Sequence, residues 1–150
     1  MADRSDIVDA LRDLINTCRD GEKGFQEAAN RVNNAQFKTM FHDISQERGR
    51  FARELEGELA SVNPDKTGKD EGHVVGSLHR AWIETKTSLG AGDQAILEWL
   101  EQGEDYAKKK YEGAQGKALP AGTLAMVRRQ AQSVQATHDR VKALRDAKAA

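Results

Sequence analysis

The sequence predicts an all-α protein built from four long amphipathic helices, and three observations carry this prediction. The 150 residues include only two prolines, Pro64 and Pro120, and are rich in Ala, Leu, Glu, Lys, Gln and Arg, which lose little side-chain freedom in a helix. Apolar residues recur at spacings of three and four over long stretches, as on one face of a helix. No stretch sustains the alternation of apolar and polar residues that is typical of a strand.

The first two expected helices cover residues 6–32 and 36–62 and form a hairpin. Asn33 and Asn34 separate them, and Asn33 with Gln36 has the form of a capping box, in which side-chain acceptors satisfy the free amides of a new helix. Two long helices joined by two residues must be antiparallel neighbours. The expected core stripes are Ile7, Leu11, Leu14, Cys18, Phe25, Ala29 and Val32 on the first helix and Phe37, Met40, Phe41, Ile44, Phe51, Leu55 and Leu59 on the second.

The last two helices are expected from residue 93 to about 113 and from Pro120 to near the end of the chain. Asp93 can cap the earlier helix, and proline suits the first turn of the later one. The expected core stripes are Ile96, Leu97, Trp99, Leu100, Tyr106, Ala107 and Tyr111 on the former and Leu124, Val127, Ala131, Val134, Val141 and Leu144 on the latter.

A long connection joins the two expected hairpins. Roughly 30 residues, 63–92, are enough to travel the length of a bundle, and the amphipathic residues 74–88 predict a short helix within them. A crossover of this length is typical of the ferritin-like variant of the four-helix bundle. The sequence thus predicts a single domain over residues 1–150, with two antiparallel hairpins joined by a long crossover.

Composition excludes several functional classes. The 23 basic and 24 acidic residues give a net charge of −1, so no overall field attracts nucleic acid or an anionic membrane. No stretch approaches the roughly 18 consecutive apolar residues of a membrane span. The single cysteine, Cys18, has no disulfide partner within the chain and is expected to be a buried core residue. Because the charged start lacks the apolar run of an export signal, we expect a cytoplasmic protein.

Polar residues interrupt the apolar stripes at one place on each helix, and these interruptions are the candidate functional site. Glu22 falls where the first stripe needs a core residue, and Glu104 shares the face of the third stripe. His138 lies directly on the fourth stripe. On the second helix, either Glu47 or Arg48 must lie at or beside the core, and Glu47 is the better candidate.

Three glutamates and one histidine could hold iron, manganese or zinc, because carboxylates neutralise the charge of the ion and imidazole adds a directional nitrogen. The alternative is a buried polar layer in which the carboxylates pair with Arg48, Arg50, Arg80 or one another, since a buried charge needs a partner. Gly21, Gly24 and Gly103 lie inside helices near the glutamates, which indicates close helix approach or local distortion there.

Several short segments carry a resemblance to a known family. They are Asp20-Gly21-Glu22-Lys23-Gly24-Phe25, Leu78-His79-Arg80-Ala81-Trp82, Glu101-Gln102-Gly103-Glu104-Asp105 and His138-Asp139-Arg140. Together they resemble a bacterial ferritin-like four-helix-bundle family described only as a domain of unknown function. The resemblance covers nearly the whole chain, and it implies a fold and no established reaction. The context of that family also implies a role in stress response.

The di-iron pattern of the wider ferritin-like group fits only half of this sequence. That pattern needs a lone glutamate on each of two helices and Glu-x-x-His on each of the other two. Glu47 is followed by Arg50 where the histidine should be, and His138 is preceded by Gln135 where the glutamate should be. The lone glutamates would be Glu22 and Glu104. A full dinuclear centre is therefore not expected, whereas a single-metal site or a degenerate di-metal site stays open.

Three functional hypotheses follow. The first is a non-catalytic helical protein with a polar centre, acting through an unidentified protein partner or as a homodimer. The second is a metal-binding or metal-dependent redox protein, with iron or manganese held by Glu22, Glu47, Glu104 and His138. The third is a small-molecule binder that uses the same interior. Apolar residues outside the four stripes, such as Trp82, are available for a dimer interface.

Overall fold

The computed structural model describes residues 3–63 and 92–149, which form four long helices. The helices are α1 (Arg4–Arg31), α2 (Ala35–Val62), α4 (Asp93–Gln115) and α5 (Ala121–Ala149). No strand occurs within these two ranges, so the all-α prediction and the four long helices are confirmed. The short helix expected over residues 74–88 lies outside the described residues. No helix in the described part of the chain is long and apolar enough to cross a membrane.

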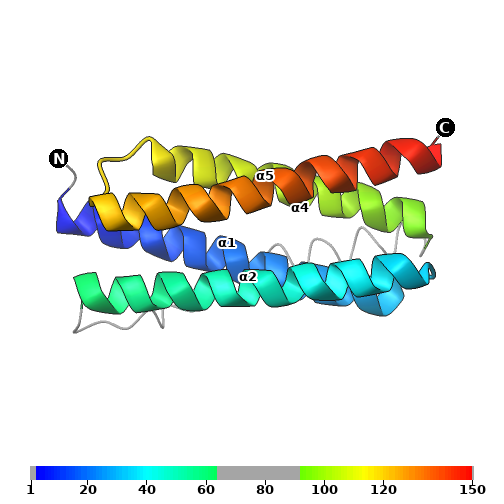
Figure 1. Cartoon of the computed structure of the whole chain (residues 1–150), viewed down its shortest axis with the longest axis horizontal. Coiled ribbons are helices and arrows are strands. Elements are labelled where there is room, and N and C mark those ends of the chain that lie inside the picture. Colours follow the sequence, from blue (N-terminus) through cyan, green and yellow to red (C-terminus); the bar gives the residue numbers. More distant parts are fainter. Residues whose placement is uncertain (1–2, 64–91, 150) are drawn as a thin grey trace.

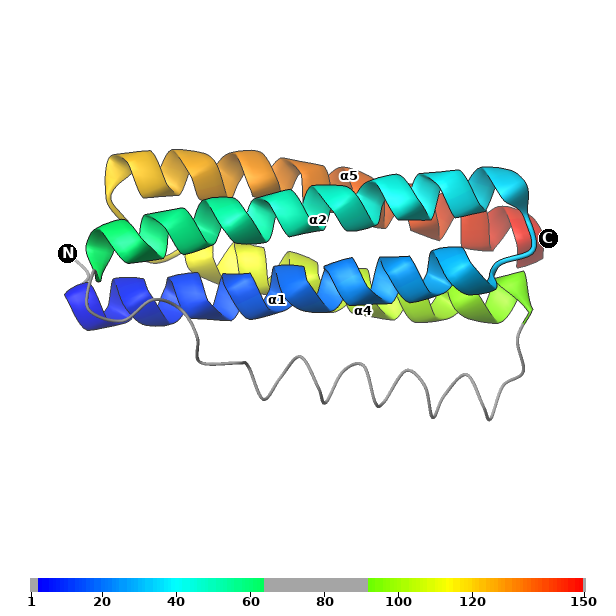
Figure 2. The same ribbon diagram turned by 90° about the horizontal axis from the view of Figure 1, so that it is seen from below.

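The four helices lie side by side along one axis as two antiparallel hairpins (Figure 1). Figure 2 shows α1 and α4 along one side of the bundle and α2 and α5 along the other. The two hairpins meet mainly where α1 packs against α4, whereas α2 and α5 touch only sparsely. Among the described helices, α2 and α4 make no close backbone approach, so they lie diagonally opposite each other.

Side chains at the two ends of the bundle fix the direction of each hairpin. Asp93, at the start of α4, accepts hydrogen bonds from the backbone N–H groups of Asn33 at 2.8 Å and Asn34 at 3.1 Å, in the turn between α1 and α2. At the opposite end, Arg4 donates to the side chain of Asn63 at 3.2 Å. The connection from α2 to α4 therefore leaves one end of the bundle and arrives at the other, as the length of the segment predicts.

These contacts correct two details of the predicted helix ends. Asn34, not Asn33, caps α2, and its side chain accepts from the N–H of Phe37 at 3.0 Å. Gly92 is the capping residue of α4 and makes no side-chain cap bond. The carboxylate of Asp93 is engaged instead by the exposed amides of the α1–α2 turn, so it joins the two hairpins rather than capping its own helix.

The apolar core consists of two clusters with a polar layer between them. One cluster lies toward the start of α1, around Leu11, Leu55 and Tyr111, and the other lies toward the α1–α2 turn, around Phe25 and Leu97. The change from one cluster to the other falls between Cys18 and Phe25, between Ile44 and Phe51, between Leu100 and Ala107, and between Val134 and Val141. The polar interruptions of all four helices therefore lie at the same level, midway along the length of the bundle.

Candidate functional site

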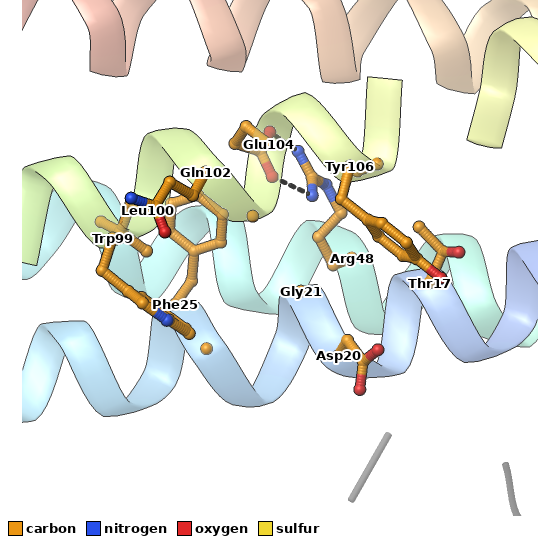
Figure 3. Close-up of a pocket in the computed structure, with 13 residues that line it drawn as sticks. Thr17, Asp20, Gly21, Phe25, Arg48, Trp99, Leu100, Gln102, Glu104 and Tyr106 are labelled. Atoms are coloured by element: carbon orange, nitrogen blue, oxygen red, sulfur yellow. Dashed lines mark hydrogen bonds and ion pairs between the residues drawn. The ribbon is translucent and has the colours of Figure 1, made fainter. Parts of the chain in front are cut away.

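A buried ion pair between Arg48 of α2 and Glu104 of α4 forms the centre of the bundle. The side chains are 1% and 2% exposed. Nη1 of Arg48 donates to Oε1 of Glu104 at 2.7 Å, and Nη2 donates to Oε2 at 2.5 Å (Figure 3). Both carboxylate oxygens are therefore engaged by one guanidinium, in the bidentate geometry that gives the strongest pairs of this kind. Because α2 and α4 are diagonal neighbours, the pair crosses the core.

The surroundings of Arg48 make room for its side chain and favour its charge. A Cβ placed on Gly21 would lie 3.0 Å from Nη1 of Arg48, so the absence of a side chain on Gly21 provides the space. The ring of Phe25 lies below the guanidinium, 5.5 Å from its centroid, which adds a cation–π attraction. Burial alone would lower the pKa of Arg48, but the charge and hydrogen bonds of Glu104 outweigh it, so the pKa is raised. Arg48 is a permanent cation.

A second buried polar chain crosses the bundle one step away from this pair. The hydroxyl of Tyr111 donates its hydrogen to Oε1 of Gln130 at 2.7 Å. Because that hydrogen is already used, the thiol of Cys18, 3.0 Å from the hydroxyl oxygen, acts as the donor to it. The amide of Gln130 then donates to Glu54 at 3.0 Å, and Glu54 also pairs with Arg129. Burial raises the pKa of Cys18 to about 11, so the thiol is neutral, which confirms it as a core residue.

Two of the predicted metal ligands lie away from the centre of the core. The side chain of Glu22 is 33% exposed and accepts from Nη1 of Arg19 at 2.8 Å. Glu47 is half-buried and accepts from the hydroxyl of Ser133 at 2.6 Å. The prediction that Glu47 rather than Arg48 faces the core is wrong. Arg48 keeps the alternating spacing of three and four residues along the buried face of α2, and the next residue on a helix is turned by about 100° from it.

The other two predicted ligands are buried, as expected, and have different partners. Glu104 is held by Arg48. Nε2 of His138 lies 2.6 Å from Oδ1 of Asp105, and Nδ1 lies 3.1 Å from Oδ1 of Asp139. Burial tends to lower the pKa of His138, but hydrogen bonds to Asp139 and Asp105 outweigh it and raise the pKa.

The four predicted ligands do not gather into one cluster. Within residues 3–63 and 92–149, no three His, Cys, Asp or Glu side chains lie together in a way that could hold a metal ion. The oxygens of Glu104 face a cation that cannot act as a ligand. The pairing of Glu104 with Arg48 therefore matches the alternative prediction, a buried polar layer in which a carboxylate pairs with arginine. Binding of iron, manganese or zinc by the four residues stays a prediction.

Beside the ion pair, a cavity of about 180 Å³ opens between α1 and α4 (Figure 3). Its wall is mainly apolar and includes Phe25, Trp99 and Tyr106. A Cβ on Gly24 would lie only 2.7 Å from Cη2 of Trp99, whereas for Gly103 no described atom lies within 4 Å. The predicted close approach at the glycines is therefore confirmed for Gly24, as for Gly21, whereas no described residue approaches Gly103.

Asp20 contributes a carboxylate without a hydrogen-bond partner to the described lining of this cavity, where Nε of Arg48 is also without one. Both of its carboxylate oxygens are shielded from water, and neither has a hydrogen-bond partner in the part of the chain that the structure describes. Burial raises the pKa of Asp20 to about 7, and the positive charge of Lys23 offsets this only in part. Perturbed carboxylates of this kind are found more often at functional sites than elsewhere.

Comparison with known families identifies the family of this chain. Residues 6–117 match a family described as a domain of unknown function, DUF2383. The chain belongs to the DUF2383 family. The match includes Arg48, Glu104 and Asp20 and ends before His138. No curated protein matches the chain. The prediction of a family without an assigned function is thus confirmed.

Sequence reasoning ranked Arg48 below Glu47 and missed two further groups that define the interior of this DUF2383 chain, namely Gln130 and Asp20. A strict alternation of three and four residues would have found the first, because Phe41, Ile44, Arg48, Phe51 and Leu55 keep it without a break. The same alternation leads from Val127 to Gln130 and Val134, all of which are buried. No sequence signal indicates that Asp20 lacks a partner, since this depends on the packing of α1 against α4.

Proposed function

We propose that this DUF2383 protein is a non-catalytic ferritin-like four-helix bundle that acts by binding, with a structural ion pair in place of a metal centre. The observation that carries the proposal is the bidentate contact between Arg48 and Glu104. It occupies the middle of the core, where ferritin-like bundles place inward-facing metal ligands.

The chemistry of the pair supports this proposal in two ways. A guanidinium cannot lose its proton or act as a ligand, so Arg48 repels a cation and withdraws Glu104 from coordination. A buried ion pair also favours one arrangement of the helices, because any register that separates the partners leaves an unpaired charge in the core. The role of the pair is then to specify how the two hairpins meet rather than to perform a reaction.

Elemental analysis tests the metal-free centre directly. Purified protein is measured before and after incubation with ferrous iron, manganese or zinc, followed by gel filtration. The variants Glu22→Ala and His138→Ala are measured in the same way, with Glu112→Ala as the matched control because Glu112 is an exposed glutamate of α4. We expect no stoichiometric metal in any sample. One or two ions per chain, lost in the first two variants and kept in the control, would contradict the proposal.

That contrary outcome would support the alternative function, a metal-binding or metal-dependent redox protein using Glu22, Glu47, Glu104 and His138. The alternative draws on the carboxylates of α1, α2 and α4 and the imidazole of α5. It requires Glu104 to exchange Arg48 for a metal ion, so Arg48→Gln should raise metal occupancy under the alternative. Under the main proposal, this variant loses stability and gains no metal.

The resemblance also implies a stress-related role, and the first functional hypothesis adds a protein partner or a homodimer. A deletion strain tests the role, through its survival of oxidative or heat stress with and without the wild-type chain. Light scattering during gel filtration tests the dimer. We expect survival to depend on the intact chain even though the protein binds no metal.

A further inference from the structure

We infer that the cavity between α1 and α4 is a binding site for a small organic cation with an apolar body, with the carboxylate of Asp20 as its counter-ion. This inference rests on the proposed function only in that the chain acts by binding. It does not depend on whether the centre of the bundle is free of metal.

The state of Asp20 is the first argument. A buried carboxylate is costly unless a hydrogen-bond donor or a positive charge compensates it. Both oxygens of Asp20 are shielded from water, and none of the described residues donates to either of them. Two other acidic residues show the kind of partner that Asp20 lacks, since Glu104 pairs with Arg48 and Glu22 pairs with Arg19. An ammonium or guanidinium group of a ligand would supply the missing donor.

The charge balance of the cavity favours a cation over an anion. Arg48 also lines the cavity, but its charge is already compensated by Glu104 at hydrogen-bond distance. The pair therefore contributes little net charge to the wall. Among the described residues that line the cavity, Asp20 is then the ionisable group without an ion-pair partner in contact, and the positive charge of Lys23 offsets its burial only in part. An anionic ligand would bring a second negative charge next to it, at a further electrostatic cost.

The apolar wall sets the rest of the ligand. Trp99 and Tyr106 reach from α4 toward α1 on either side of Gly21 (Figure 3). Asp20 lines the same cavity from α1, on the edge of that helix away from α4. Aromatic faces stabilise organic cations as well as apolar groups. The volume of about 180 Å³ is below the range of roughly 300–1,000 Å³ typical of drug-sized sites. The ligand class is accordingly a small amine or guanidine with one ring or a short alkyl chain.

Calorimetric titration with three probes of similar shape tests the charge preference. The probes are 2-phenylethylamine, which is cationic near neutral pH, the neutral 2-phenylethanol and the anionic 3-phenylpropionate. At pH 8 we expect the amine to bind at least about tenfold more tightly than the alcohol, the gain of one charge-assisted hydrogen bond. We expect no binding of the carboxylate. Equal binding of the amine and the alcohol, or no binding of the amine, would overturn the inference.

Two variants place the binding in this cavity. Asp20→Asn removes the counter-ion with little change in shape and should weaken binding of the amine about tenfold or more. Gly103→Leu adds a side chain at the exposed edge of the cavity, where no described atom lies within 4 Å of its Cβ, and should abolish binding by filling the space. Gly57→Leu is the matched control, since it adds the same side chain at an exposed and equally open helical position of α2.

The outcomes separate this inference from the proposed function. Circular dichroism and thermal unfolding first show that each variant is folded. If either cavity variant binds the amine as wild type does, or if Gly57→Leu loses binding, then the cavity is not the site. Such a result would overturn the cavity inference but would not bear on the proposed metal-free centre. Conversely, stoichiometric metal found by elemental analysis leaves amine binding to be decided by these titrations alone.

Discussion

Gly21 and Arg48 share one space in the core, since a Cβ on Gly21 would lie 3.0 Å from Nη1 of Arg48. The arginine is the largest fully buried side chain among the described residues, and it enters the core opposite a residue that has none. A glycine inside a helix costs up to about 1 kcal/mol relative to alanine. At this position the cost is offset because the charge of Arg48 can reach Glu104 in a dry interior.

Alanine substitutions at two glycines should therefore have different effects. Gly103→Ala should raise the free energy of unfolding by about 0.5–1 kcal/mol, because it gains helix propensity where no described atom lies within 4 Å. Gly21→Ala should gain less than Gly103→Ala or lower the stability, because Arg48 must move to admit the methyl group. Urea unfolding of both variants measures the difference. Equal stabilisation by the two would mean that Gly21 does not make room for Arg48.

The ion pair should show strong coupling between its two partners. Arg48→Met or Glu104→Met alone should lower the free energy of unfolding by about 3–5 kcal/mol, because each leaves an unpaired charge in the core. The double variant should be more stable than either single one, since it removes both charges and leaves apolar side chains of similar length. A double-mutant cycle from urea unfolding gives the coupling energy. Additive effects would show that the two groups are not paired in solution.

The helices were predictable from the sequence, whereas the centre of the core was predictable only in part. Spacings of three and four fix the faces of α1, α2 and α4 over many turns, so single ambiguous positions do not change the outcome. At the polar interruption the apolar signal stops, and one residue more or less turns a side chain by about 100°. Glu104 was correctly placed at the core and Glu47 was not, because a long arginine at position 48 is compatible with the core only when it has a partner.

Contacts between the hairpins were beyond what local patterns can supply. The role of Asp93 at the α1–α2 turn, 60 positions earlier in the chain, depends on how the hairpins dock. The partners of Gln130 and the lack of a partner for Asp20 depend on the same docking. His138 was correctly placed at the core from its stripe, but its hydrogen bond to Asp105 required the position of α4 relative to α5.

Asp20 should make the stability of the protein depend on pH. Burial raises its pKa to about 7 in the folded chain, above the usual value near 3.8 that applies when the chain is unfolded. The folded state therefore holds its proton more tightly, and stability is lost as the pH rises from about 4 to about 7. Asp20→Asn should remove this loss, so its stability relative to wild type should increase over that range and level off above it.

Urea midpoints of both proteins between pH 4 and pH 9, without added amines, measure this relative stability. Asp9→Asn serves as the control, since Asp9 is an exposed aspartate of the same helix. A difference between Asp20→Asn and wild type that stays constant with pH would show that the carboxyl of Asp20 is not perturbed.

His138 should give the opposite kind of pH dependence to an ordinary buried histidine. Its hydrogen bonds to Asp139 and Asp105 outweigh burial and raise its pKa in the folded state above the usual 6.5. The stabilisation is then fully present below pH 6.5 and is lost as the pH rises through the raised value. His138→Asn should lose more stability at pH 5.5 than at pH 8.5.

Proton NMR of the imidazole ring gives the titration of His138 directly. Comparison with the spectrum of His138→Asn identifies its signal among the four histidines of the chain. Asp105→Asn should shift the titration midpoint of His138 to lower pH, because it removes the negative charge of one of the two acceptors. A midpoint at or below 6.5 in wild type would contradict the prediction.

The ion pair also bears on how the chain reaches its fold, because Arg48 belongs to the first hairpin and Glu104 to the second, 56 positions away. Each hairpin can assemble early from contacts that are close in sequence, whereas their docking must close a long loop and strip water from two opposite charges together. In an isolated hairpin, the apolar stripe and the charged group both stay exposed to water, so a half-formed bundle gains little stability. Kinetic cooperativity is thus built into the middle of the core, where one guanidinium and one carboxylate become dry only when both halves have arrived.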